Sequence, residues 1–161
     1  NTTNIKKCTY LSPDSSSELS DDQNGLSVIH FNARSLLSKF LAFEKFIGEL
    51  HHKFDVISVC ETWFDKDTNL SLFNIDGYDM YNASRNQKKG GGVAIYVSKK
   101  LECELVDWAC VDDSLEIILL KISCPGLGNI LFSCVYRPPG TNIRSFYNQI
   151  KDIINKSLKP K

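Results

Sequence analysis

The order of apolar and polar residues along the chain predicts several strands and two helices behind a polar leader. Residues 1–25 are rich in Ser and Asp and show no periodicity, which predicts a disordered leader, so we expect order from residue 26 onward. Apolar runs typical of strands occupy residues 26–32, 55–60, 93–97, 115–122 and 130–136, and weaker candidates occupy 78–82 and 102–109.

Two segments have the spacing of amphipathic helices. After Ser35, which can cap a helix, apolar residues recur every three or four positions to about His51, and a second such pattern runs from about Thr141 to Asn155. The first helix lies between two strands, an order in which the strands are usually parallel. These elements predict an α/β protein, a layered sandwich with substantial sheet on both sides of the core and flanking helices.

Polar side chains stand at the carboxyl ends of three of the expected strands. They are Asn32, Glu61 and Tyr136. Ligands collect beyond the carboxyl ends of strands in α/β sheets, and a carboxylate with an amide oxygen suits Mg²⁺ or Mn²⁺. A tyrosine hydroxyl beside them could donate a hydrogen bond to a phosphate oxygen. The alternative is that these are ordinary polar residues where strands end.

Charge is balanced overall but uneven along the chain. Residues 1–80 carry 7 Lys and Arg against 12 Asp and Glu, and residues 81–161 carry 12 against 7. A basic, glycine-rich run at 85–92 could follow the phosphates of DNA through Arg85, Lys88 and Lys89. The alternatives are a solvated hairpin loop for this run and a mixed, solvated surface for the whole chain.

The cysteines and the lack of long apolar runs bear on the cellular compartment and on contact with a membrane. None of the 6 cysteines falls in a Cys-x-x-Cys pair, and no secretory signal is present, so we expect reduced thiols in an intracellular protein of the nucleus or cytoplasm. No apolar run approaches the ~18 residues that a membrane span needs, so no membrane partner is expected.

Five segments in order carry a resemblance to a known family. They are HFNARSL at 30–36, DVISVCETW at 55–63, residues 77–97 around GGGVAIYV, LEIILLKI at 115–122 and CVYRPPG at 134–140. Together they resemble the endonuclease/exonuclease/phosphatase superfamily, and within it the endonuclease domain of non-LTR (LINE-type) retrotransposon polyproteins. The resemblance covers residues 26–161. It implies a four-layer α/β sandwich, of which this chain would hold roughly the first half as a truncated domain.

The resemblance also implies an activity and roles for individual residues. The family uses Mg²⁺ to hydrolyse phosphodiesters, and its retrotransposon members nick target DNA to prime a reverse transcriptase in the same polyprotein. By motif, Glu61 would be the principal metal ligand, Asn32 would complete the metal and phosphate site, and Tyr136 would contact the scissile phosphate. Arg137 would bind the DNA backbone. Arg34 stands where abasic-site repair relatives carry Asp, which favours the retrotransposon branch, and we expect it near DNA.

Two segments of the family pattern are not found in the sequence. It contains neither Gly-Asp-x-Asn nor Ser-Asp-His, and its histidines are His30, His51 and His52. Since those segments orient the attacking water and complete the site, we expect this chain alone to be inactive or nearly so. The alternative is a non-enzymatic transposon remnant or a nucleic-acid-binding module.

Three further residues invite an interpretation. Glu116 lies inside an apolar run, so it either points outward at a sheet edge or forms a hydrogen bond near the site. Trp108 is expected in the core. Trp63, two residues after Glu61, is expected to pack against the turn, with contact to DNA as the alternative.

Overall fold

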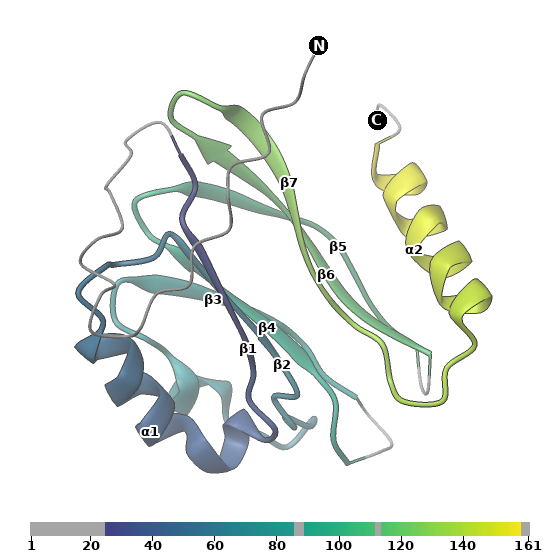
Figure 1. The fold of residues 1–161 in the computed structure, drawn as a ribbon, viewed down its shortest axis with the longest axis horizontal. Coiled ribbons are helices and arrows are strands. Elements are labelled where there is room, and N and C mark those ends of the chain that lie inside the picture. The colour runs from purple at the N-terminus through teal and green to yellow at the C-terminus, as the bar shows by residue number, and fades with distance from the viewer. Residues whose placement is uncertain (1–24, 86–88, 112–113, 159–161) are drawn as a thin grey trace, which may run out of the picture.

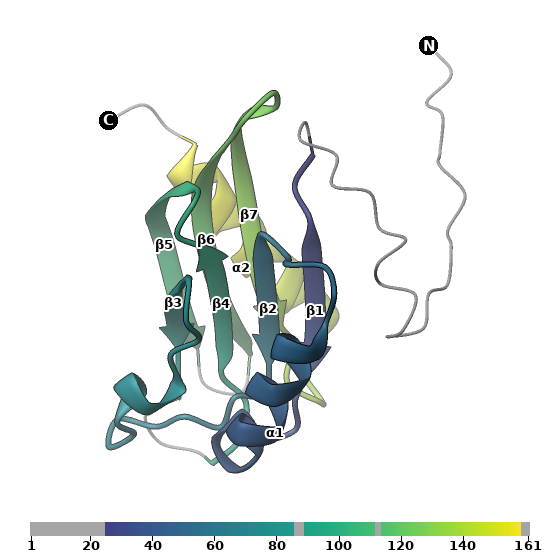
Figure 2. The same ribbon diagram turned by 90° about the vertical axis from the view of Figure 1, so that its left-hand side faces the viewer.

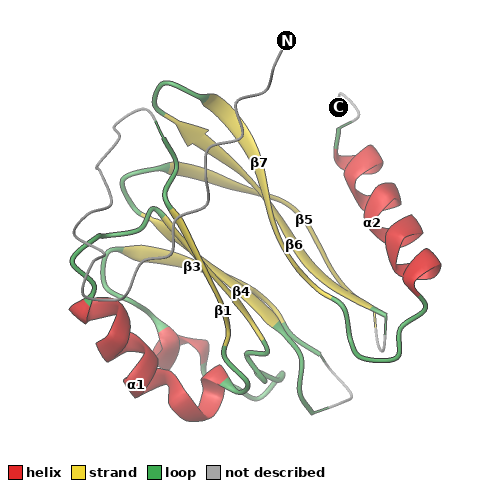
Figure 3. Cartoon of the chain, in the orientation of Figure 1, coloured by secondary structure: helices red, strands yellow, loops and turns green. Residues whose placement is uncertain are grey.

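The molecule is built in four layers, with two sheets facing each other and a helix on the outer side of each (Figure 1). The computed structural model describes residues 25–85, 89–111 and 114–158. Figure 2 looks onto the faces of the sheets from the side of α1, and Figure 3 distinguishes the helices from the strands by colour. The layered α/β sandwich that the sequence predicts is therefore confirmed.

The first sheet contains four strands in the order β1-β2-β4-β3. Their bounds are Val28–Asn32 for β1, Val56–Cys60 for β2, Tyr78–Ala83 for β3 and Val93–Ser98 for β4. Helix α1 (Leu36–Glu49) connects β1 to β2, which pair in parallel as expected, while β4 runs antiparallel to both of its neighbours. A short 3-10 helix at Leu70–Phe73, which the sequence did not predict, lies between β2 and β3.

The second sheet is an antiparallel meander of consecutive strands. It contains β5 (Glu102–Val111), β6 (Leu115–Cys124) and β7 (Gly128–Tyr136), with β6 in the centre. Helix α2 (Ile143–Ser157) follows β7 and lies on the outer side of this sheet (Figure 1). No helix in the described part of the chain is both long and apolar enough to cross a membrane.

Two apolar clusters hold the layers together. One lies between α1 and the first sheet and includes Phe40, Ile57 and Tyr96; the other lies between the sheets and includes Ile95 and Ile118. All five residues of β2 are buried because both faces of this strand are covered, which explains its unbroken apolar run.

The prediction that Trp108 lies in the core is wrong. The residue is 55% exposed. It lies on β5, at the edge of the second sheet. Among the described strands of this sheet, β5 has a hydrogen-bonded neighbour on one side, whereas β6 has one on each side.

Candidate active site

Three strand ends from the two sheets meet at one edge of the sandwich. Asn32 ends β1, Glu61 follows β2 directly, and Tyr136 ends β7. Asn32 Nδ2 donates a hydrogen bond to Glu61 Oε1 at 2.9 Å, and the Tyr136 hydroxyl donates to the same oxygen at 3.4 Å. The structure thus brings together the three residues singled out from the sequence, while their chemical roles remain predictions.

The oxygen atoms of this group suit a hard divalent cation. Glu61 is partly exposed, and no described residue donates a hydrogen bond to its second oxygen, Oε2. Asn32 adds an amide oxygen, which accepts a hydrogen bond from the Arg34 backbone N–H at 3.2 Å. A carboxylate and an amide at a solvent-accessible edge leave room for water and phosphate ligands, the arrangement that Mg²⁺ prefers.

Tyr136 is held in its protonated form. Burial raises the pKa of its hydroxyl, and the nearby negative charges of Glu61 and Glu116 raise the pKa further. The phenol therefore keeps its proton at neutral pH and stays a hydrogen-bond donor.

Glu61 has an unusual backbone conformation. Its φ is +59° and that of Trp63 is +60°, in the left-handed region that costs residues other than glycine about 1–3 kcal/mol each. On one side, the backbone N–H groups of Ser35 and Leu37 donate to the carbonyls of Glu61 and Thr62 at 2.8 and 3.0 Å. The start of α1, with Ser35 as its N-cap, therefore holds the segment 61–63 from one side.

On its other side, the segment 61–63 is bonded to the glycine segment, residues Gly90–Gly92. The Trp63 N–H donates to the Gly91 carbonyl at 2.8 Å, and the Thr62 N–H donates to the Gly92 carbonyl at 3.3 Å. All three glycines have positive φ, and a Cβ added to Gly92 would overlap Thr62 Oγ1. Only glycine allows this close approach, which explains the GGG sequence before β4.

Glu116 supports the glycine segment from the second sheet. Its side chain is fully buried in β6, and Arg85 Nε and the Gly92 N–H each donate to its carboxylate. In the strand register it lies opposite Tyr136. The outward orientation considered for Glu116 is therefore wrong, and the alternative, a hydrogen bond near the site, is confirmed.

The expectation that Arg85 follows DNA phosphates needs correction. The residue is only 8% exposed, because its guanidinium is turned inward to the buried carboxylate of Glu116. Its charge therefore balances a charge inside the protein and does not extend into solvent.

The other four residues expected to contact DNA are not buried like Arg85 where the structure describes them. Arg34, Lys89 and Arg137 are exposed, and Arg137 also donates to the Thr141 carbonyl at 3.1 Å. Lys88 lies outside the described residues. Three of the five residues expected to contact DNA are therefore exposed cations.

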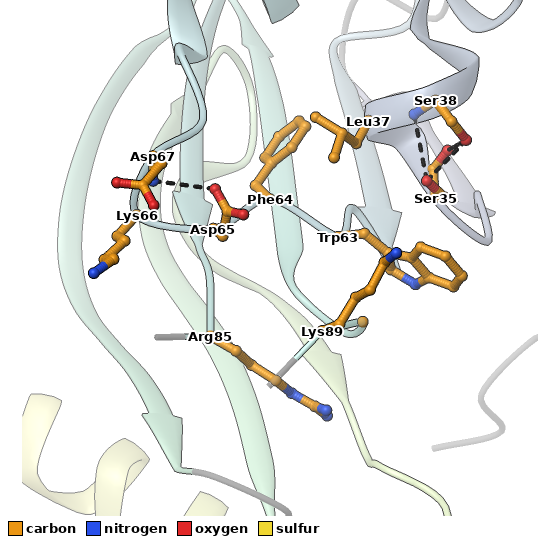
Figure 4. A pocket seen from close by; sticks show the side chains of 11 residues that line it. Ser35, Leu37, Ser38, Trp63, Phe64, Asp65, Lys66, Asp67, Arg85 and Lys89 are labelled. Atoms are coloured by element: carbon orange, nitrogen blue, oxygen red, sulfur yellow. Dashed lines mark hydrogen bonds between the residues drawn. The ribbon is translucent and has the colours of Figure 1, made fainter. Parts of the chain in front are cut away.

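A pocket of about 640 Å³ is lined by residues from the start of α1, from the segment after Glu61 and from the glycine segment, and Trp63, Arg85 and Lys89 are among them (Figure 4). Asp65 and Lys66 lie on the same wall of the pocket, so it presents charges of both signs. The Trp63 ring also lies against Gly90, where an added Cβ would be 3.8 Å from its Nε1. This contact agrees with the expected packing role of Trp63.

Comparison with known proteins identifies a family and a relative. The model of the Endonuclease/Exonuclease/phosphatase family matches residues 29–159. The chain is also similar to a probable RNA-directed DNA polymerase from transposon BS of Drosophila melanogaster, with 26% identity over 120 residues. That match spans 74% of this chain but only 13% of the relative.

Solved structures confirm the fold. An AP endonuclease, LMAP, from Leishmania major matches with a TM-score of 0.61 and 18% identity over 88% of this chain and 50% of that protein. An AP endonuclease from Archaeoglobus fulgidus matches with a TM-score of 0.52 and 22% identity, over 83% and 49% of the two chains. The chain therefore shares the part of their fold that it spans, which is about half of their length.

We predict that Glu116→Gln destabilises the protein strongly. The change leaves the buried Arg85 guanidinium without its counter-charge, and breaking a buried pair in this way costs about 3–5 kcal/mol. Urea unfolding followed by circular dichroism measures the loss. The matched control is Glu104→Gln, which breaks an exposed pair with Lys121 on the same sheet and should cost about 0–1 kcal/mol. Equal losses in the two variants would contradict the assignment.

A second prediction concerns the close approach at Gly92. Gly92→Ala and Gly140→Ala place the same methyl group at nearly the same φ, +84° and +82°, but only the first meets another atom within 4 Å. Since Thr62 is fully buried and cannot move aside freely, Gly92→Ala should cost about 1–3 kcal/mol more in free energy of unfolding than Gly140→Ala. The same denaturation experiment compares them, and a difference near zero would show that the glycine segment is not tightly packed.

Proposed function

Because this chain belongs to the endonuclease/exonuclease/phosphatase family, we propose that it carries part of a phosphodiesterase site that uses Mg²⁺ or Mn²⁺ and acts on DNA. The observation that carries the proposal is the meeting of Asn32, Glu61 and Tyr136 at one edge of both sheets. A set of oxygen ligands beside a protonated phenol suits a phosphate ester held against a hard cation.

The proposed roles follow from the position of each group. Glu61 and Asn32 would hold the cation, which when bound polarises the phosphate and stabilises the charge that develops on it. Tyr136, kept protonated by its surroundings, donates a hydrogen bond to a phosphate oxygen. Arg34, Lys89 and Arg137 contact the DNA backbone, where exposed cations replace counterions.

We further propose that the biological context is a LINE-type retroelement in which this domain nicks target DNA. The similarity to a transposon-encoded RNA-directed DNA polymerase supports this context. In such an arrangement a reverse transcriptase in the same polypeptide would use the nicked end. Arg34, at the position where repair relatives carry Asp, agrees with the same branch.

The chain by itself is proposed to be inactive or nearly so. Its sequence contains neither the Gly-Asp-x-Asn nor the Ser-Asp-His segment. General-base catalysis typically contributes about 10²–10⁴-fold, and the positioning of the attacking water adds to this. Glu61 and its neighbours can then bind a cation and a phosphate without turning over the substrate.

Metal binding tests the site directly. Titration of the purified chain with Mn²⁺, followed by the loss of the free-ion signal in electron paramagnetic resonance, should show binding that Glu61→Gln weakens roughly tenfold or more, because affinity for hard cations follows the number of charged ligands. Glu104→Gln, which changes an exposed carboxylate in the second sheet, is the control and should leave the affinity unchanged. Equal affinities for the wild-type chain and Glu61→Gln would refute the site.

Nicking of supercoiled plasmid in Mg²⁺ tests the inactivity separately. We expect no nicking above a control without protein. Nicking that Glu61→Ala abolishes would overturn the proposed inactivity while supporting the phosphodiesterase site.

A further inference from the structure

A cluster of softer ligands lies in the interior of the sandwich, apart from the oxygen ligands. One ligand atom each from His30, Cys60 and Cys134 lies within 4.8 Å of the others. The Sγ atoms of Cys60 and Cys134 are 3.8 Å apart, and both cysteines are free thiols. The residues come from β1, β2 and β7, so the cluster joins one sheet to the other.

The separation of the two sulfurs matches that of a tetrahedral zinc site. Two thiolates bound to Zn²⁺ at about 2.3 Å with a tetrahedral angle between them lie about 3.8 Å apart. An S–S bond, in contrast, requires about 2.0 Å between the sulfurs. The side chains therefore already stand at a spacing that suits a bridging ion, and a disulfide would need the strands to move.

The imidazole is positioned for ligation and gives access from solvent. His30 is exposed on the edge strand β1, and its Nδ1 is hydrogen-bonded to Ser58 Oγ at 2.8 Å. A hydrogen bond of this kind fixes the ring orientation of ligating histidines. The two cysteines are 4% exposed, so the exposed imidazole is the part of the cluster that is most accessible from solvent.

The cluster also lies directly behind the candidate active site. His30 precedes Asn32 by two positions, Cys60 immediately precedes Glu61, and Cys134 precedes Tyr136 by two. The strands β1, β2 and β7 therefore each carry one residue of the candidate active site at or next to their carboxyl end. Each also carries one residue of the soft cluster one or two positions before it. Thiolate and imidazole select Zn²⁺ and similar ions, whereas Mg²⁺ prefers oxygen, so the two sets of residues would not compete for one metal.

We propose that His30, Cys60 and Cys134 form a zinc-binding site with one open position, which ties β1, β2 and β7 together beneath the active-site edge. The site takes Zn²⁺ through two thiolates and one imidazole, and water completes the tetrahedron. The proposal does not depend on catalysis by this chain.

The test is titration of the full chain with Co²⁺, a coloured substitute for Zn²⁺, in the presence of a phosphine reductant and excess Mg²⁺. We expect one equivalent to produce a thiolate-to-cobalt charge-transfer band that one equivalent of Zn²⁺ abolishes. The band should be lost in Cys60→Ser/Cys134→Ser and retained in the control Cys103→Ser/Cys124→Ser. Zn²⁺ should also raise the Tm of the wild-type chain but not that of Cys60→Ser/Cys134→Ser.

Variants that leave both cysteines in place keep the proposal testable if the buried double variant fails to fold. Ser58→Ala should weaken Co²⁺ binding about 10–100-fold, the usual effect of removing a partner of a metal-bound histidine, and His30→Ala should weaken it further. The absence of a band, a band that survives in Cys60→Ser/Cys134→Ser, or unchanged affinity in His30→Ala would each overturn the proposal.

Discussion

The buried carboxylate of Glu116 is the constraint on which the geometry of the site depends. A fully buried charge is tolerated only when it is paired and hydrogen-bonded, and here Arg85 and the Gly92 N–H supply the partners. Glu116 belongs to the second sheet, whereas Gly92 leads into β4 of the first. The interaction therefore fixes the glycine segment relative to both sheets.

The conformation of Glu61 follows from that anchor. The glycine segment accepts hydrogen bonds from Thr62 and Trp63, and the start of α1 donates to the carbonyls of Glu61 and Thr62 from the other side. Bonds on both sides offset the cost of positive φ at Glu61 and turn its side chain toward Asn32 and Tyr136. A carboxylate held in this way would bind the proposed cation with a smaller loss of entropy.

Sequence patterns located the strands, both α-helices and the polar residues at strand ends, but not the 3-10 helix at Leu70–Phe73. Strand and helix periodicity located the β1–α1–β2 unit, and chain order then placed Asn32 and Glu61 at one edge, because parallel neighbouring strands end together. The partners of Glu116 were not predictable, since Arg85 is 31 positions away and lies in the segment after β3 of the other sheet. The same holds for Cys60 and Cys134, separated by 74 positions. The prediction that Arg85 contacts DNA was wrong because a basic residue in a glycine-rich run looks the same in sequence whether it faces DNA or a buried carboxylate.

The central claim is that Glu116, acting through the glycine segment, holds Glu61 in place for the cation. A double-mutant cycle of Glu116→Gln and Glu61→Gln, with Mn²⁺ affinity measured where circular dichroism shows all four proteins folded, tests it most directly. We expect Glu116→Gln to weaken Mn²⁺ binding when Glu61 is present and to have little effect when Glu61 is replaced, a coupling of about 0.5–3 kcal/mol as found for residues of one network. Additive effects, with no coupling between the two positions, would contradict it.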